Sequence, residues 1–362
     1  MTFFPCHGGN VHAAARAGGR RLDQIVDFSA SINPLGPSPA ALRAIREAFP
    51  LLVHYPDPDC TALVDALAAR WRLAPDRLVI GNGSSELIQA LPRALRIRRA
   101  LIVGPTFSEY ERAVRLAGGE AVSIDASRTD GYRPPLAAAL RLLRKKFDAV
   151  FVCNPNSPTG RAAGRGELRR LLAAARAAGT WTILDETFVE YCERMSLLPR
   201  MARFPRLIIL RSFTKFYALP GLRLGYAAGP PEAIASIRAQ LPPWSVNLPA
   251  QQAALAALHD RRHARASLAF MRRERPRLTR LLAALPGAVV HPSAANFLLV
   301  ELPPSLSAHA CAAGLAGHGL LVRDCSPVPG LNDRTIRVAI RRPAQNRRLV
   351  AALRRLMKET LW

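Results

Sequence analysis

Short apolar runs bounded by turn residues alternate with segments of helical period along the first two thirds of the chain. Such runs are typical of strands buried on both faces of a sheet. Strands are predicted at 77–80, 100–103, 121–124, 148–153, 181–184, 207–210 and 223–228. Helices are predicted between them at about 84–95, 107–117, 135–146 and 166–178. The alternation predicts a largely parallel sheet flanked by helices.

The pattern changes after about residue 250. Long helical segments at 250–284 and 343–358 enclose short strands near 287–290, 297–301 and 335–340. We therefore predict an α/β fold in three parts. These are a Pro/Gly-rich N-terminal arm (1–40), a large α/β domain (41–250) and a small C-terminal α+β domain (251–362).

Composition narrows the class of protein. The 362 residues are 49% hydrophobic, which supports a folded core rather than disorder. No apolar run approaches the ~18 residues that span a bilayer, and the start MTFFPCHGGN does not resemble a signal peptide. The six cysteines are scattered without metal-site spacing, so we expect neither a disulfide framework nor a metal site. A cytoplasmic protein is expected.

The formal net charge of +25 raises the question of nucleic-acid binding. Basic residues are spread over the whole chain and aromatic residues make up only 6%, whereas nucleic-acid surfaces concentrate charge and interleave aromatic rings. We do not expect nucleic acid to be the main partner. Nearly all the cations are arginines, and the only lysines are Lys145, Lys146, Lys215 and Lys358.

Lys215 lies in RSFTKFYALPGLRLGY, directly after an apolar run. An amine can lose its proton and attack a carbonyl, whereas a guanidinium stays protonated. Ser212 and Thr214 precede this lysine and Arg223 follows it. Two hydroxyls, an amine and a guanidinium suit a phosphorylated aldehyde.

Three further segments carry polar groups at strand ends. GNGSSE (81–86) opens a helix after a strand, so Gly83, Ser84 and Ser85 form a candidate phosphate turn, although an ordinary capped turn has the same composition. NPNSPTG (154–160) forms a rigid loop after a strand. The strand WTIL leads directly into Asp185. An unpaired buried charge is costly, so this acid needs a partner, which is either a ligand or one of the many arginines.

Along the chain the order is phosphate turn, Asn/Pro loop, buried acid and lysine. In this order the segments resemble the fold-type I pyridoxal 5′-phosphate (PLP) enzymes of the aminotransferase class, close to the histidinol-phosphate aminotransferases. The resemblance implies that Lys215 forms an imine with the cofactor and that Asp185 pairs with its ring nitrogen. It also implies that Tyr110 stacks on the ring and that Tyr55 reaches the phosphate from a partner subunit, which requires a homodimer. The implied phosphate site comprises Gly83, Ser84, Ser85, Ser212, Thr214 and Arg223.

The chain departs from this family pattern at two positions. Ser157 stands where the family usually has an asparagine that donates to the cofactor's phenolic oxygen, and Phe188 stands where many relatives have a tyrosine. Ser157 still carries a hydroxyl, and Asn156 is its neighbour. Both are therefore candidate donors to this oxygen.

The segments outside the cofactor motifs bear on the reaction. HGGN, DFSASINPLGP and the Arg323–Arg337 region resemble the threonine-phosphate decarboxylases of cobalamin biosynthesis. This resemblance implies conversion of O-phospho-L-threonine to (R)-1-amino-2-propanol O-2-phosphate and CO2. It implies that Arg337 holds the substrate carboxylate. The candidates for the substrate phosphate and its surroundings are His7, Gly8, Gly9, Asn33 and Arg323.

The sequence is compatible with several alternatives. An aminotransferase acting on histidinol phosphate or a similar phosphorylated amine would share every cofactor residue. His7 could be an ordinary solvated histidine, and Arg323 is one of many arginines. A PLP-dependent regulator is disfavoured because the first 76 residues show no helix-turn-helix pattern. A non-enzymatic basic binding protein would tolerate arginine in place of Lys215.

Overall fold

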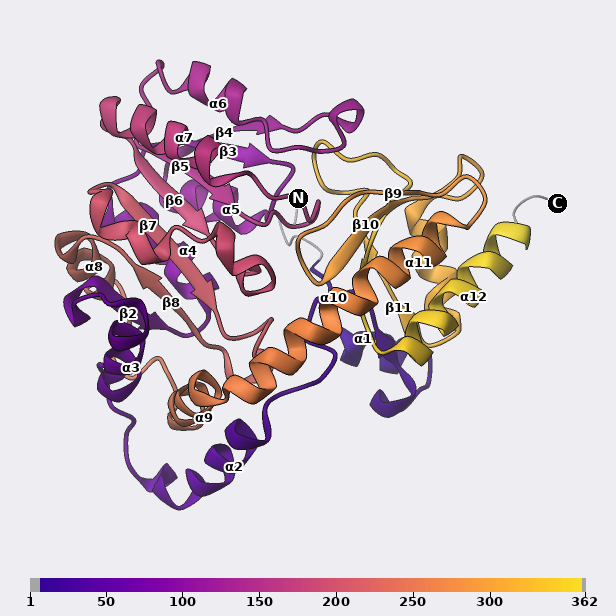
Figure 1. Cartoon of the computed structure of the whole chain (residues 1–362), viewed down its shortest axis with the longest axis horizontal. Coiled ribbons are helices and arrows are strands. Elements are labelled where there is room, and N and C mark those ends of the chain that lie inside the picture. The colour runs from indigo at the N-terminus through magenta and orange to yellow at the C-terminus, as the bar shows by residue number, and fades with distance from the viewer. Residues whose placement is uncertain (1–6, 360–362) are drawn as a thin grey trace.

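The computed structural model describes residues 7–359 and is built around a large, mostly parallel sheet (Figure 1). In spatial order its strands are β2 (Leu78–Gly81), β8 (Gly225–Ala228), β7 (Leu207–Ser212), β6 (Trp181–Asp185), β5 (Ala149–Cys153), β3 (Arg99–Gly104) and β4 (Glu120–Asp125). Strand β8 runs antiparallel to both of its neighbours, and the other pairs are parallel. The sheet confirms the predicted fold class, and each strand lies close to its predicted position.

Alternate residues of these strands contribute to two separate hydrophobic cores, one on each face of the sheet. One face is covered by α4 (Ser84–Ala94), α5 (Glu109–Leu116) and α8 (Pro231–Arg238). The other is covered by α3 (Thr61–Trp71), α6 (Leu136–Leu142), α7 (Arg165–Ala177) and α9 (Leu248–His259). Both faces are buried, which explains why the strand sequences are continuously apolar.

The smaller unit is an antiparallel sheet packed against helices (Figure 1). Its strand order is β12 (Arg323–Asp324), β13 (Thr335–Ala339), β10 (Phe297–Glu301) and β9 (Val289–Val290). Its helices are α10 (Arg261–Ala283), α11 (Ala308–Gly317) and α12 (Pro343–Glu359). A small antiparallel sheet beside the large one is the second feature of the predicted fold class, and it is confirmed.

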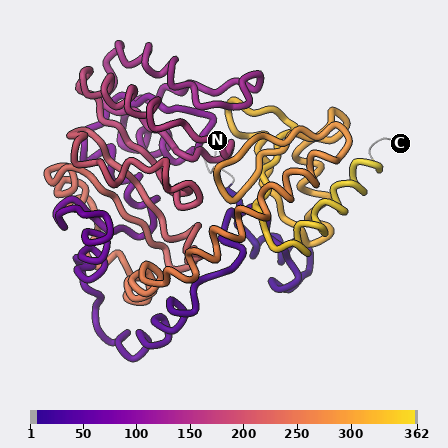
Figure 2. Tube along the Cα trace, viewed as in Figure 1, coloured from indigo at the N-terminus to yellow at the C-terminus, as the bar shows by residue number. Residues whose placement is uncertain are grey.

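The N-terminal region is built into the smaller unit. Strand β1 (Val26–Asp27) pairs in parallel with β11 (Leu320–Leu321), and Phe28 is fully buried in the core of the smaller unit. Figure 2 shows the indigo N-terminal chain passing beneath the orange and yellow helices. Helix α1 (Val11–Ala17) lies in the same region, and the chain then crosses to α2 (Pro39–Glu47), which packs against α9.

The helical prediction for 250–284 was wrong in one respect. The segment forms two helices, α9 and α10, separated at Asp260. The Asp260 carboxylate accepts a hydrogen bond from the backbone N–H of His263, so this residue caps the second helix. Helices α1, α2, α3, α8 and α11 were not predicted. Within residues 7–359, no helix has both the length and the apolar character required to cross a bilayer.

Candidate active site

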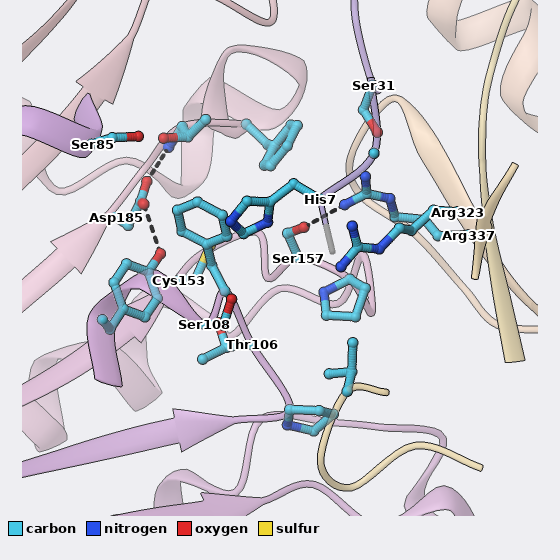
Figure 3. A pocket seen from close by; sticks show the side chains of 18 of the residues that line it. His7, Ser31, Ser85, Thr106, Ser108, Cys153, Ser157, Asp185, Arg323 and Arg337 are labelled. Atoms are coloured by element: carbon cyan, nitrogen blue, oxygen red, sulfur yellow. Dashed lines mark hydrogen bonds between the residues drawn. The ribbon is translucent and has the colours of Figure 1, made fainter. Parts of the chain in front are cut away.

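A cavity of about 460 Å³ lies where the large sheet, the smaller sheet and the N-terminal arm meet (Figure 3). Asp185 ends β6 and Lys215 follows β7, so both stand at the carboxyl end of the parallel strands. Open α/β sheets bind their ligands at this edge. The smaller sheet contributes Arg323 and Arg337, and the arm contributes His7.

The amine of Lys215 has a pKa well below that of an ordinary lysine. Burial lowers its pKa to about 8, with the positive charges of Arg337 and Arg223 acting in the same direction and Asp185 opposing them. The unprotonated fraction of this amine near neutral pH is therefore far larger than that of an ordinary lysine, and the unprotonated form is the one that a nucleophilic lysine requires.

Asp185 is a buried carboxylate at the bottom of the cavity. Its Oδ1 accepts from the backbone N–H of Thr187 at 2.8 Å, and its Oδ2 accepts from the Tyr110 hydroxyl at 2.7 Å. Burial raises the pKa of Asp185 despite these hydrogen bonds. A cationic ring N–H placed beside this carboxylate would offset the cost of its desolvation.

The structure gives Tyr110 a different position from the one expected. Its ring is 1% exposed and stacks on Phe151 with a centroid distance of 5.5 Å, while its hydroxyl is bonded to Asp185. Phe107, which was not singled out from the sequence, is half-buried and also lines the cavity, edge-on to Tyr110. Phe107 is therefore the more accessible ring for stacking on a flat ligand.

The phosphate turn is shaped by two close approaches. Gly83 has φ +81°, and a Cβ there would lie 2.6 Å from Nη2 of Arg223, so the guanidinium rests directly on this glycine. A Cβ on Gly225 would lie 2.5 Å from the backbone nitrogen of Ser84. The N-terminus of α4 is thereby held against β8, and its amides and the Arg223 charge converge on one anion site.

Hydroxyl groups complete this site. Ser84, Ser85 and Thr214 line the cavity. Ser212 does not line it, but its Oγ accepts from the backbone N–H of Thr214 at 3.2 Å and lies 2.8 Å from Oγ1 of Thr214. Ser212 therefore orients the hydroxyl of Thr214.

Arg323 and Arg337 form a second cationic region. They face each other across the β12–β13 pair and lie side by side in Figure 3, with the Arg337 side chain reaching Ser157. Nη1 of Arg337 donates to Ser157 Oγ at 2.7 Å, and Nη2 donates to the backbone oxygen of Ser29 at 2.8 Å. No carboxylate within residues 7–359 forms an ion pair with either arginine. Two adjacent, unneutralised guanidinium groups indicate an anion site.

The N-terminal arm forms part of the cavity wall near Arg323 and Arg337. His7 lines the cavity, and its Nε2 lies 3.0 Å from Oε1 of Glu109, a buried carboxylate of α5. Gly8 also lines the cavity, and a Cβ on it would overlap the backbone of Ser29. Gly9 lies outside the lining and donates its N–H to Ser29 Oγ at 2.7 Å. Ser29 thus links the arm to Arg337, a role that the sequence did not signal.

Three further candidates from the sequence, besides Ser212 and Gly9, lie outside the lining of the cavity. Asn156 does not line the cavity, because its amide donates to the Pro105 carbonyl and to Thr159 and its Oδ1 accepts from Thr106. It is therefore a loop-bracing residue rather than a free donor.

Asn33 is 3% exposed and also lies outside the lining. Its amide donates to the Phe216 carbonyl and to Ser267, and its backbone N–H donates to the Lys215 carbonyl. It fixes the arm against the lysine segment instead of facing the substrate. Tyr55 is 79% exposed and stacks on Trp244, outside this cavity.

The comparisons with known proteins agree with this arrangement. The family model for aminotransferases of class I and II matches residues 23–353. The chain belongs to this family. PLP is the family's cofactor, which confirms the prediction made from the sequence.

Relatives of two functions are similar to the chain over nearly its whole length. It is 38% identical to the threonine-phosphate decarboxylase of Salmonella typhimurium, with 98% of this chain and 97% of the relative covered. It is 34% identical to the histidinol-phosphate aminotransferase of an Anaeromyxobacter species, covering 93% and 92%. The structure of the PLP-bound histidinol-phosphate aminotransferase from Sinorhizobium meliloti superposes with a TM-score of 0.86 at 26% identity, covering 99% and 96%.

The residues at the cavity fit PLP. An aldehyde needs an unprotonated amine, and Lys215 has a lowered pKa. A phosphate needs the anion site at the start of α4. A ring nitrogen needs a carboxylate, and the buried Asp185 supplies one. Close to it, the hydroxyl of Thr187 is buried and has no hydrogen-bond partner among the described residues. A polar ligand in the cavity could satisfy this hydroxyl.

The lowered pKa of Lys215 predicts how cofactor loading depends on pH. Only the unprotonated amine attacks an aldehyde, so the rate of covalent PLP loading into cofactor-free protein should rise with pH to a midpoint near 8, rather than near 10.5. Stopped-flow absorbance measures this rate. Arg337→Met removes a nearby positive charge and should move the midpoint upward, whereas Arg342→Met outside the cavity should not. A wild-type midpoint near 10 would contradict the assignment.

Proposed function

We propose that this protein is a PLP-dependent decarboxylase that converts O-phospho-L-threonine to (R)-1-amino-2-propanol O-2-phosphate and CO2 in cobalamin biosynthesis. The observation that carries the proposal is the pair of unneutralised arginines, Arg323 and Arg337, on facing positions of β12 and β13. O-Phosphothreonine has two anionic groups besides its amine. The similarity to the Salmonella typhimurium threonine-phosphate decarboxylase supports the same reading.

Each residue at the cofactor end of the cavity has a separate role in binding PLP. PLP, when bound, supplies an electron sink for the bonds at the substrate Cα. Lys215 would hold the cofactor covalently, and Asp185 would keep a proton on its ring nitrogen. Ser84, Thr214 and Arg223 would hold its phosphate together with the amides of α4. Phe107 would cover its ring, with Tyr110 holding Asp185 in place.

The substrate end determines which bond breaks. The bond set perpendicular to the cofactor ring is the one that cleaves, so the residue that holds the carboxylate has a decisive role. Arg337 is braced by Ser157 and by the Ser29 carbonyl, which leaves it little freedom to turn. We assign the carboxylate to Arg337 and the substrate phosphate to Arg323 and His7.

The second candidate is an aminotransferase acting on histidinol phosphate or a similar phosphorylated amine. The 34% identity to an Anaeromyxobacter histidinol-phosphate aminotransferase favours it, and it would use the same Lys215, Asp185 and phosphate site. Histidinol phosphate has no carboxylate. A second arginine in the cavity would then have to serve the amino-acid partner of the exchange.

Release of CO2 tests the proposed reaction directly. PLP-loaded protein given O-phospho-L-threonine without any keto acid should release one CO2 per substrate consumed and form the amino-alcohol phosphate. Mass spectrometry of the product and a coupled CO2 assay measure both. A protein that binds PLP but releases no CO2, and that transfers the amino group of histidinol phosphate to 2-oxoglutarate, would establish the second candidate.

Removing Arg337 should weaken substrate binding more than cofactor binding. Arg337→Ala should raise KM for O-phospho-L-threonine by the equivalent of about 2–5 kcal/mol, because one partner of a desolvated charge pair is lost. Steady-state kinetics and the PLP spectrum measure the two effects. Arg342→Ala is the control, because Arg342 also donates to an arm carbonyl but does not line the cavity. An unchanged KM in Arg337→Ala would contradict the assignment.

We also propose a homodimer in which Tyr55 completes the phosphate site of the partner. An exposed apolar strip supports this, since a surface patch of this kind is typical of an interface. Its members lie between α2 and α3 and on the loop before α9: Phe49, Leu51, Leu52, Val53, Tyr55 and Trp244. A second copy of the chain would bury them.

The strip predicts the effect of charge on assembly. Wild-type protein should be a dimer by light scattering, whereas Val53→Asp, at a side chain that is 83% exposed, should give monomers that bind PLP more weakly. Leu116→Asp is the matched control, because Leu116 is also an exposed apolar residue, at 67%, but lies outside the strip. Equal behaviour of the two variants would refute the proposed interface.

A further inference from the structure

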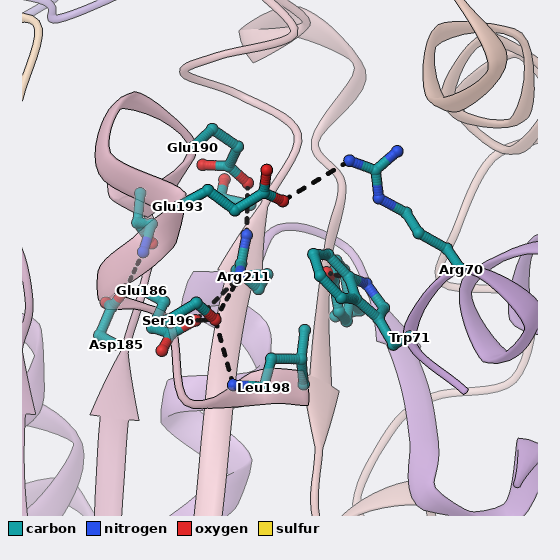
Figure 4. A network of polar contacts seen from close by, with 12 residues as sticks. Arg70, Trp71, Asp185, Glu186, Glu190, Glu193, Ser196, Leu198 and Arg211 are labelled. Carbon is teal, nitrogen blue, oxygen red and sulfur yellow. Dashed lines mark hydrogen bonds and ion pairs between the residues drawn. The ribbon is translucent and has the colours of Figure 1, made fainter. Parts of the chain in front are cut away.

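A polar network is buried on the face of the large sheet that α3 covers, beside Trp71 (Figure 4). At its centre Arg211 donates from Nε to Glu186 at 3.0 Å, from Nη1 to Glu190 at 3.0 Å and from Nη2 to Ser196 at 2.9 Å. Arg211 and Glu186 are each 1% exposed. The indole of Trp71 lies against the guanidinium at 5.0 Å. Arg211 is therefore a fully buried charge with a partner on each nitrogen.

The network lies one residue away from the cofactor groups on two neighbouring strands. Glu186 directly follows Asp185 at the end of β6, and Arg211 directly precedes Ser212 at the end of β7. The two strands are parallel, with Asp185 beside Leu210. The ion pair between Arg211 and Glu186 therefore ties together the two strand ends from which Asp185 and the Ser212–Lys215 segment extend into the cavity.

The network also fixes the chain that returns behind Asp185. Ser196 Oγ donates to Glu186 Oε2 at 2.7 Å, and Glu186 Oε1 accepts from the backbone N–H of Leu197 at 2.8 Å. Residues 186–198 are thus closed into a loop on Arg211. The start of this loop, Thr187 and Phe188, lines the cavity.

An apolar cluster could fill the same space. Replacing a buried ion network by apolar residues of similar volume is often neutral for stability, because desolvation offsets the attraction between charges. What the guanidinium adds is direction, since its planar fork fixes the angle of each acceptor. Removing Arg211 alone is different, because it leaves Glu186 and Glu190 buried without their cation and so lowers stability. The positioning role of Arg211 therefore has to be measured at the strand ends, separately from the free energy of unfolding.

We propose that Arg211 is a positioning residue for cofactor binding, which sets the distance between Asp185 and the Thr214–Lys215 segment by clamping Glu186. It acts through its neighbours and does not touch the cavity. The proposal concerns the PLP site alone, so it holds whether the enzyme is a decarboxylase or an aminotransferase.

The test compares PLP affinity and the visible circular dichroism of the bound cofactor in Arg211→Met and wild type. Loss of the clamp should raise the Kd for PLP about 10- to 100-fold, the range found when residues that support the ligands of a bound metal are removed, and reduce the dichroic band, with far-ultraviolet dichroism retained. Arg211→Lys should recover part of the affinity, because an ammonium can still bond one carboxylate.

Arg128→Met is the matched control. Arg128 pairs at 2.7 Å with Glu301, a carboxylate that is 2% exposed and belongs to the smaller sheet. This variant therefore also disturbs a buried acid, although Glu301 keeps Arg334 as a second partner at 3.2 Å. Its PLP affinity and dichroic band should stay at wild-type values. An unchanged Kd in Arg211→Met, or an equal loss in Arg128→Met, would overturn the proposal.

A milder variant keeps the test decisive if Arg211→Met does not fold. Ser196→Ala removes the hydroxyl that joins Nη2 of Arg211 to Glu186 and leaves the charges in place. It should raise the Kd for PLP measurably without lowering the melting temperature in proportion. A wild-type Kd in Ser196→Ala would count against the clamp.

Discussion

The desolvated carboxylate of Asp185 is the constraint around which the cavity is organised. A charge buried at a strand end is costly unless other groups compensate for it, and burial raises the pKa of this carboxyl even with two hydrogen bonds in place. The Tyr110 hydroxyl donates a hydrogen bond to it from one side, and the backbone N–H of Thr187 donates from the other. Lys215 supplies a nearby positive charge, and in return its own pKa is lowered less than burial and the arginines would dictate. Acid and amine are therefore electrostatically linked before any ligand binds.

The end of the cavity that holds Arg337 depends on a different feature, which is the insertion of the arm into the smaller unit. Strand β1 pairs with β11, the Phe28 carbonyl accepts from Ala339, and the next residue, Ser29, gives its carbonyl to Arg337. The same serine receives the N–H of Gly9 and holds Asp27 with its own hydroxyl. The cavity groups on the Arg337 side thus come from the arm and from β13 as one assembly, while Asp185 and Lys215 come from the large sheet.

Much of this could be predicted from the sequence, because continuous apolar strands and their polar ends are local signals. The positions of β5, β6 and β7, and with them Asp185 and Lys215, follow from such signals. Asn33 and Asn156 could not be sorted from true cavity residues, because an asparagine that braces a loop and one that faces a ligand have the same sequence context. The choice between Phe107 and Tyr110 depends on which ring is covered by Phe151, a contact between a helix and a strand far apart in the chain. Ser29 has a role only because the arm folds back on β13.

The two departures from the family pattern meet at the same side chain. Ser157, in place of the usual asparagine, accepts a hydrogen bond from Nη1 of Arg337 and keeps its own proton free to donate. Phe188, in place of a tyrosine, packs edge-on against Phe297 at 5.0 Å, and the guanidinium of Arg337 lies over the Phe297 ring at 5.1 Å. A shorter polar residue on one side and an apolar support on the other both restrict the same guanidinium. Because a guanidinium that cannot turn holds a bound anion in one orientation, both departures bear on how firmly Arg337 can orient its ligand.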